Sequence, residues 1–116
     1  MLILGFWHEQ SRYDRDNFVK INFENIVEGA EHNFQKREEK YSETFEKNLI
    51  SRTPYDYCSV MHYHEDAGAK PGFGPTIEPF WSFDQLECRY IGQRKRLSKW
   101  DWKKINLLYS LECILP

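Results

Sequence analysis

The 116-residue chain lacks several features that would fix its class at once. It has three cysteines, none of them in a C-x-x-C pair, so no thiolate set for a structural zinc site is evident. It contains no N-x-[ST] sequon and no apolar run of membrane-spanning length. The apolar stretch 1–4 is too short for the core of a signal peptide. We therefore expect no membrane span, and the sequence gives no glycosylation clue to its compartment.

A strong charge of either sign is also missing. The formal net charge is -2, and Arg94-Lys95-Arg96 is the only basic run, so the sequence gives no electrostatic reason to expect a nucleic-acid partner. Aromatic residues, in contrast, make up 16% of the chain. Although the mean hydropathy is low at -0.74, this aromatic content can bury a core and argues against disorder. The length corresponds to one ordinary domain.

The odd number of cysteines leaves their pairing open. Cys58, Cys88 and Cys113 cannot all pair within one chain. One disulfide plus a free thiol is one arrangement. A cysteine whose partner lies in upstream sequence is the other.

Local patterns predict a few short elements separated by long loops. Residues 18–21 have the composition of a short strand, and residues 67–79 are rich in glycine and proline, which predicts a loop with a single bridge at Thr76-Ile77. From Asn22 the apolar spacing changes to that of a helix, which we expect to extend to about Arg37. Its predicted buried face carries Ile26, Val27, Ala30 and Phe34.

A second helix is expected at the C-terminal end. Ser98 and Asp101 have the spacing of a capping box, with Asp in place of the usual Glu. Ile105, Leu108 and Tyr109 then mark one helical face that we expect to be buried.

The N-terminal stretch carries part of a metal-site pattern. In H-E-x-x-H-x-x-G-x-x-H, two histidines lie one helical turn apart, and the glycine turns the chain so that a third histidine reaches the same ion. Gly5 and His8 fit the last two named positions. Leu2 stands where the second histidine would be, and the first histidine and the glutamate would precede residue 1.

Several longer strings, in one order along the chain, resemble the astacin family of zinc metalloendopeptidases, within the metzincin clan. Taken alone, G-x-x-H would be too common to carry this resemblance. The matching strings are Gly5-Phe6-Trp7-His8-Glu9-Gln10-Ser11-Arg12, Asp14-Arg15-Asp16, Pro54-Tyr55-Asp56-Tyr57 with Ser59-Val60-Met61-His62-Tyr63, Pro75-Thr76-Ile77-Glu78-Pro79, Ile91-Gly92-Gln93-Arg94 with Leu97-Ser98, and Lys104-Ile105-Asn106 with Leu108-Tyr109.

The resemblance implies roles for individual residues. His8 matches the third zinc-binding histidine, and Gly5 matches the glycine that turns the chain toward it. Met61 matches the Met-turn methionine, which forms an apolar floor under the metal without binding it. Tyr63 matches a tyrosine that ligates zinc through its phenol and can swing away to stabilise the transition-state oxyanion. Glu9 matches a buried acid whose partner in the mature family enzyme is the N-terminal ammonium.

The implied fold is a loop-rich α+β unit, the C-terminal subdomain of an astacin-like catalytic domain, with a middle helix and a C-terminal helix. Residues 1–116 would then form a partial domain that lacks the N-terminal sheet subdomain and most of the zinc helix. The family closes a disulfide two positions before Cys113, where Leu111 stands, with an upstream partner. It supplies no disulfide for Cys58 or Cys88. For His32, His62 and His64 we expect ordinary polar or structural roles.

The resemblance also implies Zn²⁺ as cofactor, protein or peptide substrates and a secreted, extracellular location. A catalytic zinc needs three protein ligands, and a glutamate to accept the proton of its water. Because Leu2 cannot ligate and no glutamate precedes it, we expect weak or absent zinc binding and no peptidase activity from this chain alone.

Several explanations of this incomplete motif stay open. The chain is a fragment of a longer reading frame, a degenerate copy, or both together, and a sequence error at Leu2 is a lesser alternative. In function, the alternatives are a non-catalytic peptide-binding or protein-binding remnant and a gene relic without function.

Overall fold

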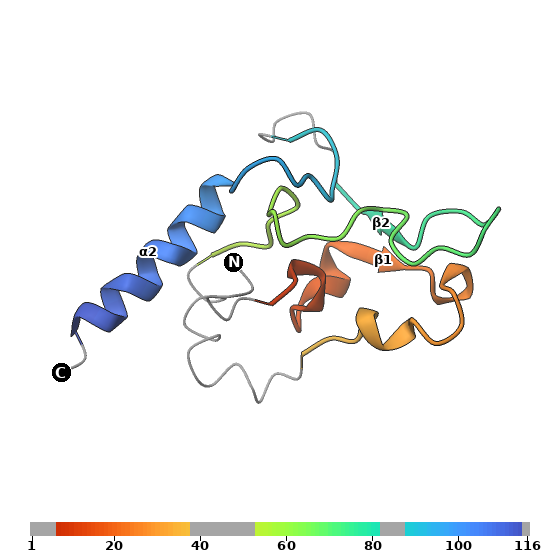
Figure 1. The fold of residues 1–116 in the computed structure, drawn as a ribbon, viewed down its shortest axis with the longest axis horizontal. Helices are drawn as coiled ribbons and strands as arrows, with labels where there is room; N and C mark the ends of the chain where they lie inside the picture. The colour runs from red at the N-terminus through yellow and green to blue at the C-terminus, as the bar shows by residue number, and fades with distance from the viewer. Residues whose placement is uncertain (1–6, 38–52, 82–87, 115–116) are drawn as a thin grey trace.

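A computed structural model describes residues 7–37, 53–81 and 88–114, with the side chains of the last helix described as far as residue 107. These residues form a two-stranded sheet and one α-helix, joined by irregular segments and short 3₁₀ turns. The helix α2, Lys99–Ile114, extends away from the rest of the chain (Figure 1). The two strands lie side by side in the body of the molecule. This is the loop-rich combination of helix and strand that the sequence predicts. No described helix is long and apolar enough to cross a membrane.

The sheet pairs two segments that are far apart in sequence. β1, Val19–Ile21, runs antiparallel to β2, Ile77–Pro79, with Val19 opposite Pro79 and Ile21 opposite Ile77. Alternate residues of a strand point to the same face, so Ile77 shares a face with Pro79, the partner of Val19. Val19 and Ile77 are almost fully buried on this face. The predicted strand at 18–21 is confirmed, and the single bridge expected at Thr76-Ile77 is instead a three-residue strand.

The core beneath the sheet is small and aromatic. Phe18 stacks on Tyr55 with 4.7 Å between ring centroids, and Tyr57 packs edge-on against Tyr55 at 5.4 Å. The Tyr57 hydroxyl donates to the Phe18 carbonyl oxygen at 2.6 Å, so its buried polar end is satisfied. The buried residues of this cluster are Val19, Ile26, Phe34, Tyr55, Tyr57, Ile77 and Ile91.

The prediction of a middle helix over residues 22–37 is wrong. The structure has two 3₁₀ turns there, Phe23–Asn25 and Glu31–Phe34, and Gly29 between them has φ +94°. A positive φ interrupts a right-handed helix and suits glycine. Asn22, where the helix was expected to begin, makes no side-chain cap. Its amide instead donates to the Pro75 carbonyl oxygen at 2.9 Å.

The backbone of residues 22–37 forms hydrogen bonds with the loop at Gly68 and Lys70 instead of forming a helix. The Val27 N–H donates to the Gly68 carbonyl oxygen at 2.8 Å, and the Lys70 N–H donates to the Asn25 carbonyl oxygen at 2.8 Å. Backbone groups paired across two segments cannot also form i→i-4 bonds. Of the predicted apolar face, Ile26 and Phe34 are buried, Ala30 packs against the core, and Val27 is exposed.

The predicted capping box at the start of α2 is confirmed. The Asp101 N–H donates to Ser98 Oγ at 3.0 Å, and the Ser98 N–H donates to Asp101 Oδ2 at 3.0 Å. Ile105 is buried as expected. The side chains of Leu108 and Tyr109 are not among those described.

A tight turn at Ile91-Gly92 packs directly on the chain after Tyr63. Gly92 has φ +82°, and a Cβ added there would lie 2.4 Å from His64 Cα and 2.6 Å from His64 N. No side chain larger than hydrogen fits without moving one of the two backbones.

We expect Gly92→Ala to destabilise the chain by about 3 kcal/mol, because it combines left-handed backbone strain with a backbone clash. Gly72→Ala is the matched control, since Gly72 has φ +79° and nothing within 4 Å of an added Cβ. The control should cost only about 1 kcal/mol from strain. Urea unfolding of both variants measures the difference, and equal losses would show that contact with His64 does not matter.

Candidate functional site

His8 is the residue before a 3₁₀ turn, Glu9–Ser11. It contacts the backbone of residues 59–63, the segment predicted to be the Met-turn and called the Met-turn below. The Met61 carbonyl oxygen lies 2.9 Å from His8 Nδ1 and also accepts the Glu9 N–H at 3.2 Å. A carbonyl oxygen can only accept, so Nδ1 carries the imidazole proton in this arrangement. The lone pair of the neutral ring is therefore on Nε2, which is the state that a metal-binding histidine requires.

Tyr63 lies beside His8, with 4.5 Å between ring centroids and a tilt of 59° between the rings. Side chains hold both polar groups of its backbone. Its N–H donates to Gln10 Oε1 at 3.1 Å, and its carbonyl oxygen accepts from His62 Nδ1 at 2.8 Å. The backbone of Tyr63 is thus fixed on both sides by side chains of the described part of the chain.

His62 has the structural role expected of it. It is buried, and the Tyr55 hydroxyl donates to its Nε2 at 2.8 Å. Burial lowers the pKa of His62, which keeps the imidazole neutral and lets Nε2 accept. His64 is exposed, and so is His32, which lies on the rim of a groove beside His8.

Met61 is buried, and it contacts His8 through its backbone carbonyl. Its N–H donates to Ser59 Oγ at 3.0 Å, which helps to close the turn. The role of its side chain as a floor under a metal stays a prediction. Gly5 and Leu2 lie outside the described residues.

The donors in this region fit zinc in kind but not in number. A catalytic zinc takes three protein ligands, and His8 Nε2 with the Tyr63 phenol makes two. Across 7–37, 53–81 and 88–114 no group of three His, Cys, Asp or Glu side chains is close enough to hold a metal. The role of His8 as a metal ligand stays a prediction.

Glu9, next to His8, is a buried carboxylate with three hydrogen-bond partners. Its Oε2 accepts from Lys104 Nζ at 2.7 Å, and its Oε1 accepts from Arg12 at 3.1 Å and from the Asp56 N–H at 3.0 Å. Burial by itself raises the pKa of Glu9, but the Lys104 ammonium and the Arg12 guanidinium outweigh it and hold the pKa below its ordinary value. Glu9 is therefore ionised in the interior.

Sequence reasoning missed Lys104 as the partner of Glu9. The signal available was that Lys104 comes three residues after Asp101 and one before Ile105, so all three share a helical face. A lysine on an expected buried face needs a buried anion, because an unpaired charge there is costly.

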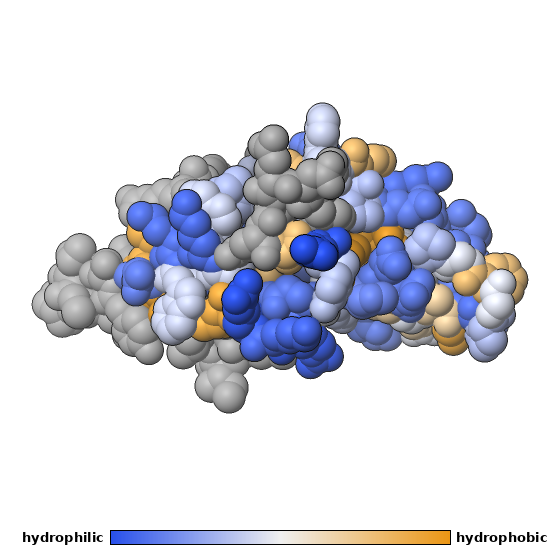
Figure 2. Space-filling view, turned by 90° about the horizontal axis from the view of Figure 1, so that it is seen from above, coloured by the Kyte–Doolittle hydropathy of each residue, from blue (hydrophilic) through white to orange (hydrophobic). Residues whose placement is uncertain are grey.

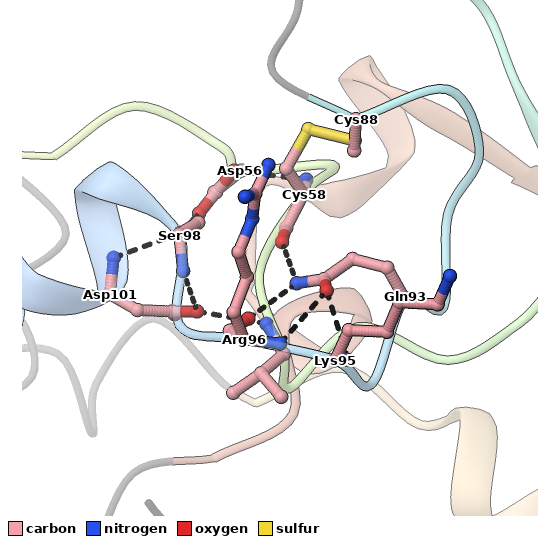
Figure 3. The surroundings of a disulfide bond; sticks show 9 residues. Asp56, Cys58, Cys88, Gln93, Lys95, Arg96, Ser98 and Asp101 are labelled. Carbon is pink, nitrogen blue, oxygen red and sulfur yellow. Dashed lines mark hydrogen bonds between the residues drawn. A yellow bond between two sulfur atoms is a disulfide. The ribbon is translucent and has the colours of Figure 1, made fainter.

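A second polar network ties α2 to the Met-turn (Figure 3). Asp101 Oδ1 accepts from Ser59 Oγ at 2.6 Å, and Asp101 Oδ2 accepts from the Val60 N–H at 2.8 Å. Ser98 Oγ donates to Asp56 Oδ2, and the Cys58 N–H donates to Asp56 Oδ1 at 2.9 Å. The cap of the helix and the turn that carries Tyr63 are therefore one hydrogen-bonded unit.

The disulfide left open by the sequence pairs Cys58 with Cys88, at a Cα–Cα distance of 5.5 Å (Figure 3). It joins the Met-turn to the loop before Gly92. Gln93 makes a parallel tie, since its Nε2 donates to the Cys58 carbonyl oxygen at 2.6 Å and to the Arg96 carbonyl oxygen at 2.8 Å. The side chain of Cys113 is not among those described.

A groove of about 370 Å³ lies beside His8 and Tyr63. On its rim the Arg37 guanidinium stacks on the Trp7 ring, 3.4 Å from the ring centroid. Its lining residues are Trp7, His8, Ser11, His32, Asn33, Gln35, Lys36, Arg37 and Tyr63. The lining is partly aromatic and partly basic. On the face seen from above the fold, polar side chains dominate the described surface (Figure 2).

The chain is similar to a zinc protease of known structure. A solved structure of high choriolytic enzyme 1 from Oryzias latipes, described as a hatching enzyme zinc-protease, matches with a TM-score of 0.73 and 41% identity. The match covers 90% of this chain and 46% of that one. The fold is thus that of part of a zinc protease.

The family follows from a family model. The model for the peptidase family Astacin matches residues 1–110. Similar curated proteins include high choriolytic enzyme 1 of Oryzias latipes, 42% identical over 92% of this chain, and human meprin A subunit beta, 45% identical over 92% of this chain. This chain belongs to the astacin family. It spans 35% and 14% of the length of these two relatives.

Replacement of Lys104 by methionine should destabilise the chain by about 3 kcal/mol, because it leaves a buried carboxylate short of one cation. Lys103→Met, at an exposed position of the same helix, is the matched control and should cost little. The double variant Glu9→Gln with Lys104→Met should lose less than the sum of the two single changes. Strict additivity in urea unfolding would contradict a Glu9–Lys104 pair.

Asp56 should give the stability a distinct pH dependence. Burial raises its pKa from 3.8 to about 6, so the folded state binds this proton more tightly than the unfolded state does. The contribution of Asp56 therefore becomes more favourable as the pH falls from about 6 toward 4. In Asp56→Asn that component of the slope should disappear, with stability at pH 7 equal to or above that of the parent.

The measurement for Asp56 is the urea midpoint at several pH values between 4 and 8. Asp66→Asn, at an exposed carboxylate, serves as the control. Parallel pH curves for the parent and Asp56→Asn would show that the Asp56 carboxyl is not buried as described.

Proposed function

We propose that residues 1–116 form the C-terminal part of the catalytic domain of an astacin-like zinc metalloendopeptidase, which cleaves peptide bonds with a zinc-activated water. The observation that carries the proposal is the His8–Tyr63 pair, with the His8 ring fixed by the Met61 carbonyl so that Nε2 is the available nitrogen. The Met-turn residues of the family pattern lie next to His8, although 53 positions separate His8 from Met61.

In this proposal His8 would hold the zinc through Nε2, and the Tyr63 phenol would be the second donor from this chain. Bound zinc lowers the pKa of a water molecule to near 7 and polarises the substrate carbonyl. The Met61 carbonyl fixes the tautomer and orientation of His8. Tyr63 would stabilise the negative charge that develops on the substrate oxygen, because Gln10 and His62 hold its backbone and keep its ring beside His8.

As a 116-residue polypeptide the chain should be inactive. Leu2 stands at the second histidine position of the motif, and the catalytic glutamate and first histidine belong to positions before residue 1. With His8 and Tyr63 as the donors, zinc binding should be weak. The codons upstream of Met1, and a checked codon for Leu2, would distinguish a fragment from a degenerate copy.

Substrates and location follow the same proposal. The substrates would be proteins or peptides, which the groove beside His8 could accommodate as an extended chain. The Cys58–Cys88 disulfide supports a secretory or extracellular location, because disulfides persist in oxidising compartments.

A second candidate function is a non-catalytic peptide-binding remnant. The groove of about 370 Å³ with its Trp7–Arg37 stack favours this candidate, since it does not need the metal. Binding of a peptide by metal-free chain, with no cleavage, would support this candidate over the first.

Metal analysis of the purified chain and a cleavage assay on a denatured protein test the proposal. We expect zinc well below one ion per chain, no cleavage, and little change in either for His8→Ala. His32→Ala is the matched control, since His32 lines the same groove. If the chain holds one zinc and cleaves the substrate, with both properties lost in His8→Ala but not in His32→Ala, the proposed inactivity is wrong.

A further inference from the structure

A second cavity, of about 320 Å³, lies on the Cys58–Cys88 disulfide, distinct from the groove at His8. Figure 3 shows the disulfide with Arg96 extending alongside and Gln93 on the other side of Cys58. The cavity is lined by Cys58, Cys88, Arg89, Tyr90, Gln93, Lys95, Arg96 and Ser98. It therefore brings a redox-active bond and a set of basic side chains to one place.

The charged side chains among the described lining residues of this cavity are all cations. Arg89, Lys95 and Arg96 are exposed cations on its wall, and no carboxylate is among its described lining residues. The nearest acid in Figure 3, Asp56, already accepts hydrogen bonds from Ser98 Oγ and the Cys58 N–H. A wall of three cations within a small volume attracts anions and concentrates them near the sulfur atoms.

The two half-cystines differ in access. Cys58 is 3% exposed, whereas Cys88 is only partly buried. An incoming sulfur would therefore reach Cys88 first. We propose that this cavity is a docking site for an anionic low-molecular-weight thiol, which opens the Cys58–Cys88 bond by thiol–disulfide exchange at Cys88.

The exchange proceeds in two balanced steps. The thiolate of the small molecule attacks Cys88 Sγ, so a mixed disulfide forms and the Cys58–Cys88 bond breaks. Cys58 leaves as a thiolate and takes a proton from water. A second thiolate then attacks the small-molecule sulfur of the mixed disulfide, which releases Cys88 and a small disulfide. The protein bond gains two electrons, which two small thiols supply.

Opening this bond would act on the turn that carries Tyr63. Cys58 lies in the segment that leads to Met61, and the loop after Cys88 reaches Gly92, which packs on His64. In the oxidised chain Gln93 also donates to the Cys58 carbonyl oxygen. The disulfide is thus not alone in joining the loop to the Met-turn, and its loss need not unfold the chain.

Exchange kinetics test the proposal on the oxidised chain, with the mixed disulfide and the reduced form counted by mass spectrometry. Glutathione, with a net negative charge at neutral pH, is compared with uncharged 2-mercaptoethanol. The rate of each thiol with the chain is divided by the rate of the same thiol with a small uncharged disulfide. We expect a normalised advantage of about 5-fold for glutathione at low salt, which 0.5 M NaCl largely abolishes.

Two triple variants separate local charge from net charge. Arg89→Gln, Lys95→Gln and Arg96→Gln together should remove the glutathione advantage and leave the 2-mercaptoethanol rate unchanged. The matched control changes three exposed cations outside the cavity lining: Lys20→Gln, Arg94→Gln and Lys103→Gln. It should retain the advantage.

Several results would overturn the proposal. Equal normalised rates for the two thiols would show that the cavity is not a docking site for anionic thiols. An equal loss of the glutathione advantage in both triple variants would show the same. A rate that does not rise with thiol concentration would mean that unfolding of the chain, not docking, limits exposure of the bond. A mixed disulfide found at Cys58 instead of Cys88 would contradict the assigned point of attack.

Discussion

The buried carboxylate of Glu9 is the interaction on which the other parts depend. It is adjacent to His8, and it binds Lys104 from α2, Arg12 from the following turn and the backbone of Asp56. A buried charge is tolerated only when such partners compensate it. Moving any one partner away would cost free energy, because it would leave the Glu9 carboxylate buried with fewer partners. Through Glu9, the helix and the Met-turn segment both bear on the position of His8.

The features predicted correctly from sequence are governed by neighbours along the chain. The capping box at Ser98 and Asp101 needs only three residues of spacing, and the strand near Val19 needs only local composition. The family resemblance likewise rests on contiguous strings, such as the eight residues from Gly5, so a single sequence was sufficient to find it.

The features that sequence missed depend on contacts between distant segments. Residues 22–37 have helical spacing, but Gly68 and Lys70 compete for their backbone groups, and no periodicity in 22–37 reveals that competition. The pairing of Cys58 with Cys88 is also set by tertiary proximity, because three cysteines allow several pairings. The raised pKa of Asp56 arises from burial that only the packed structure defines.

The site itself was predicted in part. Its histidine and tyrosine came from the motif, and the structure brings their rings to 4.5 Å. The reason for that approach, a Met61 carbonyl shared by His8 and the Glu9 N–H, could not be derived from spacing. The membership in a zinc protease family and the arrangement of His8 agree, while Leu2 argues against a complete zinc site in this polypeptide.

We infer that His8, through Nε2, is the metal-facing histidine of this chain. A zinc titration followed by the ¹⁵N signals of its four histidines tests it most directly. We expect the unprotonated nitrogen of His8 to be Nε2 and its signal to move first, in weak, fast exchange, while the buried His62 stays still. A His8 that is unprotonated at Nδ1, or that does not respond while His32 and His64 do, would contradict the account.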